Sequence, residues 1–203
     1  MNEKNPIIKR VLFHLFASGS LLYHVEPYKD KGYHSLTELM AHETVYYDLY
    51  ENYQKCEIDF LIENRILKID KNRKLRYENI KVLSALETIW EFGCCSYWHY
   101  DKDVRKGLDD LLELGFLVTD DHLLTKNERG YFSYYTDDSK YTNGYAYRNH
   151  YAHGSSPQVD DDNAHVTAYF TMLRLFIILI LKICDDLWLA RLILAENPIL
   201  PIR

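Results

Sequence analysis

The segment from Tyr147 to Ser156 holds the side chains of this chain that are best suited to chemistry. It places Arg148, Asn149 and His153 within about one and a half helical turns. On an ideal helix Asn149 and His153 lie about 40° apart around the axis, and the long side chain of Arg148 reaches the same edge. Such an edge offers a cation for a developing oxyanion, a positioning amide and an imidazole that exchanges protons near neutral pH. Cleavage of a phosphodiester without a metal needs these groups.

The order of these residues, with a polar residue directly after the Arg and Gly154 directly after the His, resembles the Arg-polar-His motif of the HEPN superfamily. The resemblance covers residues 125–196 and implies an all-helical bundle that dimerises, with two motifs facing each other in a cleft that cuts RNA. Many members of the family are toxins or act in defence against phage, and some have lost activity.

By this resemblance Arg148, Asn149 and His153 are the catalytic residues, RNA is the substrate, and neither a metal nor another cofactor takes part. The alternative from the residues alone is that the Arg and the His pair with neighbouring acids or cap carbonyls at an ordinary helix end. Tyrosines gather between residues 131 and 151, where their rings either stack on unpaired bases or pack an amphipathic interface. Three neighbours of the motif are expected to contact the substrate: Tyr147, His150 and Tyr151.

A long apolar segment follows the motif, and residues 163–190 are expected to form one helix. Four charged residues interrupt its apolar stretch short of the roughly 20 residues that a bilayer requires, so no membrane association is expected. A helix that is apolar on nearly all sides is typical of the centre of a bundle or of a subunit interface. The segment therefore predicts a homodimer. The charged residues are Arg174, Lys182, Asp185 and Asp186.

An internal repeat organises the first two thirds of the chain. Residues 58–70 align without gaps with residues 108–120, and Asp, Leu, Glu, Leu and Asp recur in register. Each copy is expected to form an amphipathic helix that runs into a short strand. A further helix is expected before each copy, at Ser35–Glu43 before the first and at Asn79–Phe92 before the second. Ser35 and Glu38 are expected to form a capping box at the start of the earlier helix. This pattern predicts two tandem winged-helix-like units, the second one degenerate.

A basic cluster lies in the expected wing of the first copy, residues 65–77, where Asp70 is its only acid before Glu78. Lys71, Arg73 and Lys74 in its turn are the candidates for binding phosphates. One alternative is that the cluster only solvates an edge strand, and another is a transcription regulator that contacts DNA through residues 65–74. The cluster comprises Arg65, Lys68, Lys71, Arg73, Lys74 and Arg76.

Bulk properties limit these interpretations. The chain has 203 residues, enough for two compact units, and a net charge of −6, which confines any contact with RNA to local basic patches. Its four cysteines show no paired spacing, and nothing at the N-terminus resembles a signal peptide, so a cytoplasmic location with reduced thiols is expected. A zinc site at Cys94, Cys95, His99 and His122 is the weaker alternative to buried free cysteines.

The sequence thus predicts a mainly α protein, in which a winged-helix-like region with short strands, residues 1–124, precedes a HEPN-like helical region, residues 125–203. The expected function is metal-independent endoribonuclease action, controlled by a regulatory partner protein. The competing interpretation is a non-catalytic module of the same folds that binds a partner protein or nucleic acid.

Overall fold

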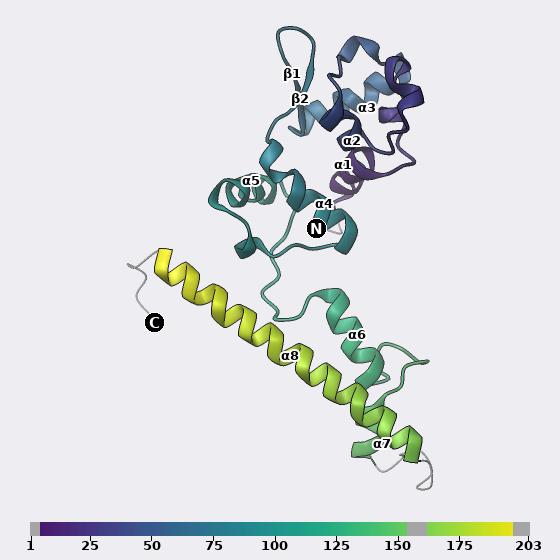
Figure 1. Ribbon diagram of the computed structural model, residues 1–203, viewed down its shortest axis with the longest axis vertical. Coiled ribbons are helices and arrows are strands. Elements are labelled where there is room, and N and C mark those ends of the chain that lie inside the picture. Colours follow the sequence, from purple (N-terminus) through teal and green to yellow (C-terminus); the bar gives the residue numbers. More distant parts are fainter. Residues whose placement is uncertain (1–4, 154–161, 197–203) are drawn as a thin grey trace. The chain divides into compact units, whose positions relative to one another are not determined.

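The computed structural model describes residues 5–153 and 162–196. The chain divides into two compact units, residues 1–119 and 120–203, which are coloured purple to teal and green to yellow in Figure 1. The described residues are mainly helical and contain one sheet of two strands. The expectation of a mainly α protein is therefore confirmed.

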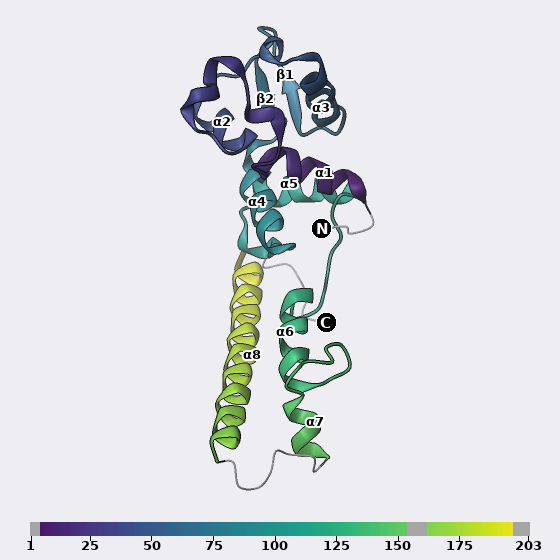
Figure 2. The same cartoon turned by 90° about the vertical axis from the view of Figure 1, so that its right-hand side faces the viewer.

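The N-terminal unit has five α-helices, a hairpin and several short 3-10 turns among its described residues (Figures 1 and 2). In chain order the elements are α1 (Pro6–Phe16), η1 (Leu21–Tyr23), η2 (Glu26–Lys31), α2 (Leu36–His42), η3 (Tyr47–Leu49), α3 (Asn52–Glu63), β1 (Leu67–Ile69), β2 (Leu75–Tyr77), η4 (Ile80–Val82), α4 (Leu83–Phe92), η5 (Tyr97–His99) and α5 (Lys102–Glu113).

Helix α1 runs through the core of this unit. Asn5 accepts a hydrogen bond from the backbone N–H of Ile7 and so caps the helix, and Pro6 occupies the first helical position, where its missing N–H costs nothing. The helix buries Ile8, Val11, Leu12 and Leu15, which share one helical face. These side chains pack with apolar residues from every other helix of the unit in one continuous core.

Helix α2 begins with one half of the capping box that the sequence predicts. The hydroxyl of Ser35 accepts a hydrogen bond from the backbone N–H of Glu38 at 3.1 Å. The carboxylate of Glu38 reaches back to the backbone N–H of His34, one residue before the expected position. The first four N–H groups of a helix lack a partner within it, and the bond from Glu38 to Ser35 satisfies one of them.

The hairpin forms where the basic cluster lies. Strands β1 and β2 pair antiparallel, with Lys68 opposite Arg76. A third segment joins β2 on its other edge, since the N–H of Leu75 donates to the carbonyl of Val45 and Tyr46 makes a bridge with Lys74. The chain before α3 therefore pairs with the strand that follows the turn.

The repeat is visible in how its two helices end. After α3, Arg65 adopts a left-handed conformation (φ 58°), and the N–H of Ile66 donates to the carbonyl of Leu61. After α5, Gly115 adopts the same conformation (φ 72°), and the corresponding N–H of Phe116 donates to the carbonyl of Leu111. Both ends are hydrogen-bonded left-handed caps, fifty residues apart in the chain.

The structural repeat extends further towards the N-terminus than the aligned residues 58–70 and 108–120. The hydroxyl of Tyr47 donates to Asp59, and the hydroxyl of Tyr97 donates to Asp109. A cation lies over each ring, and the two cations, like the tyrosines and the acids, are fifty positions apart. The duplicated part therefore includes the 3-10 turns η3 and η5 that precede α3 and α5. The cations are Lys55 and Arg105.

The strand expected in the second copy does not form. Phe116 and Leu117 are buried, but residues 114–119 contain no strand. A strand needs a partner, and in the first copy β2 supplies it after a turn of five residues, 70–74. In the second copy the chain continues from Asp120 towards helix α6 instead.

The C-terminal unit contains three helices among its described residues: α6 (Lys126–Thr136), α7 (Tyr147–Ala152) and α8 (Asp162–Glu196). Helix α6 contacts both α7 and α8, and Figure 2 shows α6 and α7 lying along α8. Thr125 and Glu128 form a capping box at the start of α6, and Lys182 of α8 pairs with Glu128 at 2.8 Å. Ala168, Leu175 and Leu189 are the buried side chains of α8.

Candidate active site

Helix α7 carries the Arg-polar-His motif. It spans six residues, and His153 follows as its C-cap, with its N–H donating to the carbonyl of Asn149 at 3.0 Å. This bond is that of a helical turn, so the structure places the amide and the imidazole four positions apart on one helical edge, as the sequence predicts. Gly154 and the acidic loop after it lie outside the described residues.

The start of α7 is held by a close backbone contact. The N–H of Tyr145 donates to the carbonyl of Tyr134 in α6 at 2.8 Å. A Cβ on the adjacent Gly144 would lie 2.6 Å from that carbonyl oxygen, which is closer than real Cβ atoms come. Glycine is therefore required here. Ala146 is buried and adopts a left-handed conformation (φ 45°) directly before the helix.

The tyrosines around the motif pack mainly on one another. The rings of Tyr135 and Tyr145 are stacked with centroids 5.5 Å apart, and Tyr145 in turn stacks on Tyr147 at 5.2 Å. The guanidinium of Arg174 in α8 lies over the other end of this cluster, 5.5 Å from the ring of Tyr135. The cluster joins all three helices, so packing accounts for most of these rings. Burial raises the pKa of Tyr147.

Two members of the α7 segment are tied to their surroundings. The side-chain amide of Asn149 donates to Asp138 at 2.8 Å, and the hydroxyl of Tyr151 lies 2.7 Å from the Nδ1 atom of His165 in α8. The first bond fixes the turn before α7, and the second fixes the helix against α8. Among the described residues, Asn149 thus keeps its side-chain oxygen and the second N–H of its amide available to a substrate group.

Arg148 and His153 differ from these neighbours. Both are exposed. Within residues 5–153 and 162–196, neither side chain has an ion pair or a hydrogen bond. The expectation that a helix-end Arg and His merely pair with neighbouring acids is not met in this part of the chain. His150 is half-buried and has an interaction of its own.

The basic hairpin belongs to the N-terminal unit, and the fold surrounds it with more acid than the sequence suggests. Arg73 makes two hydrogen bonds to Asp48, at 2.7 and 2.6 Å, and adopts a left-handed conformation (φ 62°). The ammonium of Lys74 donates to Thr44, and Lys71 is exposed with no ion pair among the described residues. Two further pairs neutralise the strands: Arg76 with Asp70 and Lys68 with Glu78. Asp70 is therefore not the only acid that balances the cluster.

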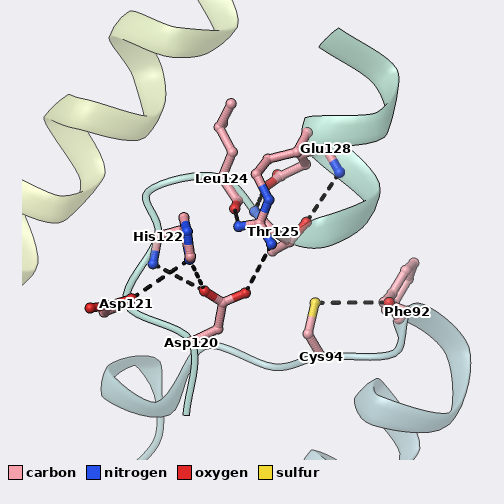
Figure 3. A network of polar contacts seen from close by, with 9 residues as sticks. Phe92, Cys94, Asp120, Asp121, His122, Leu124, Thr125 and Glu128 are labelled. Carbon is pink, nitrogen blue, oxygen red and sulfur yellow. Dashed lines mark hydrogen bonds and ion pairs between the residues drawn. The ribbon is translucent and has the colours of Figure 1, made fainter. Parts of the chain in front are cut away.

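An acidic cluster at the start of the C-terminal unit was missed in the sequence. Ligand atoms of Asp120, Asp121 and His122 lie within 4.8 Å of one another, which suits a metal ion. Asp120 is already occupied, because one of its oxygens contacts the imidazole of His122 (Figure 3). The other oxygen lies 3.3 Å from the guanidinium of Arg129. Hydrogen bonds from His122 and Arg129 lower the pKa of Asp120 to about 2. We therefore interpret the cluster as a structural contact that fixes the start of α6.

A pocket of about 440 Å³ in the N-terminal unit was also missed. Ile66, Val82 and Leu86 supply apolar walls, and Arg65 and Asp110 lie among its polar lining residues. The pocket lies between the hairpin of the first copy and the helices of the second. In the sequence, only the internal repeat indicates that these segments belong to two neighbouring units.

Comparisons with family models, with curated proteins and with solved structures find no match for this chain. The resemblance to the HEPN superfamily therefore rests on the motif and its surroundings alone.

Proposed function

We propose that this protein is a metal-independent endoribonuclease of the HEPN type, a toxin or an effector of defence against phage. The observation that carries the proposal is the exposure of Arg148 and His153 at one short helix with no partner among the described residues. An unpaired guanidinium and an unpaired imidazole in solvent are available to a substrate. Side chains kept for packing would be covered or paired.

The proposed reaction uses the RNA itself as the nucleophile. The ribose 2′-hydroxyl attacks the adjacent phosphorus, and its proton passes to the imidazole of His153. The guanidinium of Arg148 stabilises the charge that develops on the phosphate oxygens. The 5′-oxygen leaves with a proton from a second imidazole, so the products carry a 2′,3′-cyclic phosphate and a 5′-hydroxyl. Asn149, held by Asp138, orients the edge of the helix.

The proposal includes a homodimer through the helix of residues 163–190. One His153 cannot accept the first proton and donate the second in the same instant, so a second copy of the chain supplies the other imidazole. Exposed rings near the motif, of which Tyr151 is one, are proposed to contact bases. We also propose that a regulatory partner protein controls the activity.

A second candidate function, a non-catalytic binding module, draws on the N-terminal unit. Helix α3, the hairpin and the bridge from Tyr46 follow the order of a winged helix, and we propose that fold for residues 36–77. Such a unit reads DNA or holds a partner protein. Because Asp48, Asp70 and Glu78 already neutralise three of its basic side chains, we rank nucleic-acid contact through the hairpin below the ribonuclease.

The ribonuclease proposal is tested with the purified chain and a panel of single-stranded RNAs in excess EDTA. Matched substrates carry 2′-deoxy substitutions at every position. We expect cleavage of the RNAs to persist in EDTA and cleavage of the deoxy substrates to be absent, because the 2′-hydroxyl is the nucleophile. Cleavage of the deoxy substrates, or loss of RNA cleavage in EDTA, would contradict the mechanism.

A further inference from the structure

The face of α8 that points away from α6 carries a regular apolar stripe. Nine side chains follow one another at alternating intervals of three and four residues, and all nine are exposed in the C-terminal unit, the large ones between 36% and 63%. This spacing, 3.5 residues on average, is the heptad repeat of a coiled coil. The stripe consists of Val166, Tyr169, Leu173, Phe176, Ile180, Ile183, Leu187, Ala190 and Leu194.

The stripe is distinct from the side of α8 that is already covered. Ala168, Leu175 and Leu189 are buried, and on an ideal helix they lie roughly 120° around the axis from the stripe. Helix α8 is therefore apolar on more than one side, and the described residues leave the stripe uncovered. An exposed apolar surface of this length on a helix marks an interaction site.

Two charged residues indicate what covers the stripe. In heptad terms, Val166 and Leu173 occupy a positions, and Tyr169 and Phe176 occupy d positions. Asp186 then falls at a g position and Arg191 at the following e position, and the other flanking positions carry no acid, Lys or Arg. In a parallel coiled coil, a g residue faces the e residue five positions later on the partner helix. Asp186 and Arg191 are five positions apart.

These two charges have no partner among the residues of their own chain that the structure describes. Asp186 and Arg191 are exposed, and neither has an ion pair or hydrogen bond within residues 5–153 and 162–196. A second, parallel copy of α8 in register would pair each Asp186 with the Arg191 of the other copy, on both sides of the two-fold axis. An antiparallel arrangement places g opposite g and e opposite e, and so separates the two charges.

We propose that α8 forms a parallel, in-register, two-stranded coiled coil with α8 of a second copy of this chain. The consequence for catalysis rests on the proposed function. Tyr151 of α7 contacts His165 near the start of α8, so a parallel pair brings both motifs to the same end. An antiparallel pair would hold the two ends of the stripe roughly 40 Å apart, at about 1.5 Å per residue.

A membrane is the competing occupant of this surface. Despite Arg174, Lys182, Asp185 and Asp186, α8 is one continuous helix that by length and composition could cross a bilayer, and little of it is buried. The absence of membrane association stays a prediction. Charged residues inside a bilayer are costly, whereas a coiled coil leaves Arg174 and Lys182 outside the seam and pairs Asp186 with Arg191.

Cysteine cross-linking of the full chain tests the arrangement. The background carries Cys56→Ser and Cys184→Ser, because both thiols are exposed. Leu173→Cys and Leu187→Cys, at equivalent stripe positions fourteen residues apart, are each oxidised separately. A parallel, in-register pair gives a disulfide-linked dimer for both variants, whereas an antiparallel pair cannot give both. Thr167→Cys, exposed and off the stripe, serves as the control and should give none.

Charge reversal provides an independent readout in solution. Asp186→Arg alone and Arg191→Asp alone should each weaken dimerisation by roughly three- to tenfold in sedimentation equilibrium, the usual scale for exposed ion pairs, and the double variant should restore it. A monomer at high micromolar concentration, or recovery only with phospholipid vesicles and without either cross-link, would overturn the proposal. RNA cleavage is assayed on the same preparations. A cross-linked dimer that cleaves no RNA contradicts the ribonuclease and leaves the coiled coil standing.

Discussion

At the scale of single residues, Lys71 is the least engaged cation of the hairpin turn in the part of the chain that the structure describes. Its neighbours Arg73 and Lys74 are engaged by Asp48 and Thr44, so reversing either one would disturb the hairpin as well as its surface charge. Lys71 is exposed and has no ion pair within the described residues, so it reports on surface charge alone.

If the hairpin binds phosphates, Lys71→Glu should weaken nucleic-acid binding about equally for all sequences and lower the slope of log affinity against log salt by about 1. Fluorescence anisotropy with a labelled oligonucleotide at several salt concentrations measures this slope. Lys102→Glu, an exposed lysine at the start of α5, is the matched control. An unchanged slope would identify the basic cluster as a solvated edge.

His14 gives the N-terminal unit a pH dependence. Its ring is buried, its Nε2 atom lies 2.8 Å from Glu57, and Arg10 contacts the same carboxylate oxygen at 2.6 Å. Burial lowers the pKa of His14 below 6.5 and outweighs the attraction of Glu57, whose charge Arg10 already balances. The folded state therefore disfavours the protonated ring, and stability that is present above pH 6.5 is lost as the pH falls towards the lowered pKa.

Denaturant titrations of the wild-type chain at pH 7.5 and pH 5 should thus show a lower free energy of unfolding at pH 5. His14→Gln should remove most of this difference, and His34→Ala, an exposed histidine, should keep it. A wild-type chain that is more stable at pH 5 would mean that the pair with Glu57 dominates over burial.

The sequence shows the types of the site residues but only part of their environment. The placement of Asn149 and His153 on one helical edge follows from their spacing. Asn149 bonds to Asp138, 11 positions away, and Arg73 bonds to Asp48, 25 positions away. No local sequence pattern predicts either bond. The acids that neutralise the hairpin were underestimated for this reason.

At the scale of elements, the repeat makes two helix ends comparable. Arg65 and Gly115 occupy equivalent left-handed caps, but an L side chain pays about 1 kcal/mol or more for this conformation, and glycine does not. Gly115→Ala should therefore destabilise the N-terminal unit by about 1 kcal/mol, and Arg65→Gly should stabilise it by up to about 1 kcal/mol.

Chemical denaturation of the full chain, followed by circular dichroism, measures both changes. A Cβ on Gly115 would meet no atom within 4 Å, so steric clash does not confound the first variant. Equal stability of the wild type and Gly115→Ala would show that the left-handed conformation at this helix end does not affect the free energy of unfolding.

Elements with strong local signals were predictable, and elements that depend on a partner were not. Ser35 and the apolar period predicted α2, and the turn between β1 and β2 predicted a hairpin. The strand expected at the end of the second copy, residues 108–120, is missing because no later segment among the described residues pairs with it. The heptad stripe of α8 could be read directly from the sequence, but its exposure could not.

At the scale of the whole molecule, the chain consists of a duplicated N-terminal unit with its own core and a helical unit that presents the motif. Two observations in the helical unit support one account of function. Arg148 and His153 are exposed and have no partner within residues 5–153 and 162–196. The exposed apolar stripe of α8 would bring two such motifs to one end of a dimer.

The single-turnover rate of RNA cleavage by His153→Ala tests this account most directly, with His34→Ala as the matched histidine control. We expect a fall of about a hundredfold or more for His153→Ala, the usual scale for one acid-base group, with circular dichroism and oligomeric state unchanged. Arg148→Ala should fall by a similar factor, since it stabilises the charged intermediate. A His153→Ala variant that folds and cleaves RNA at the wild-type rate would contradict the account.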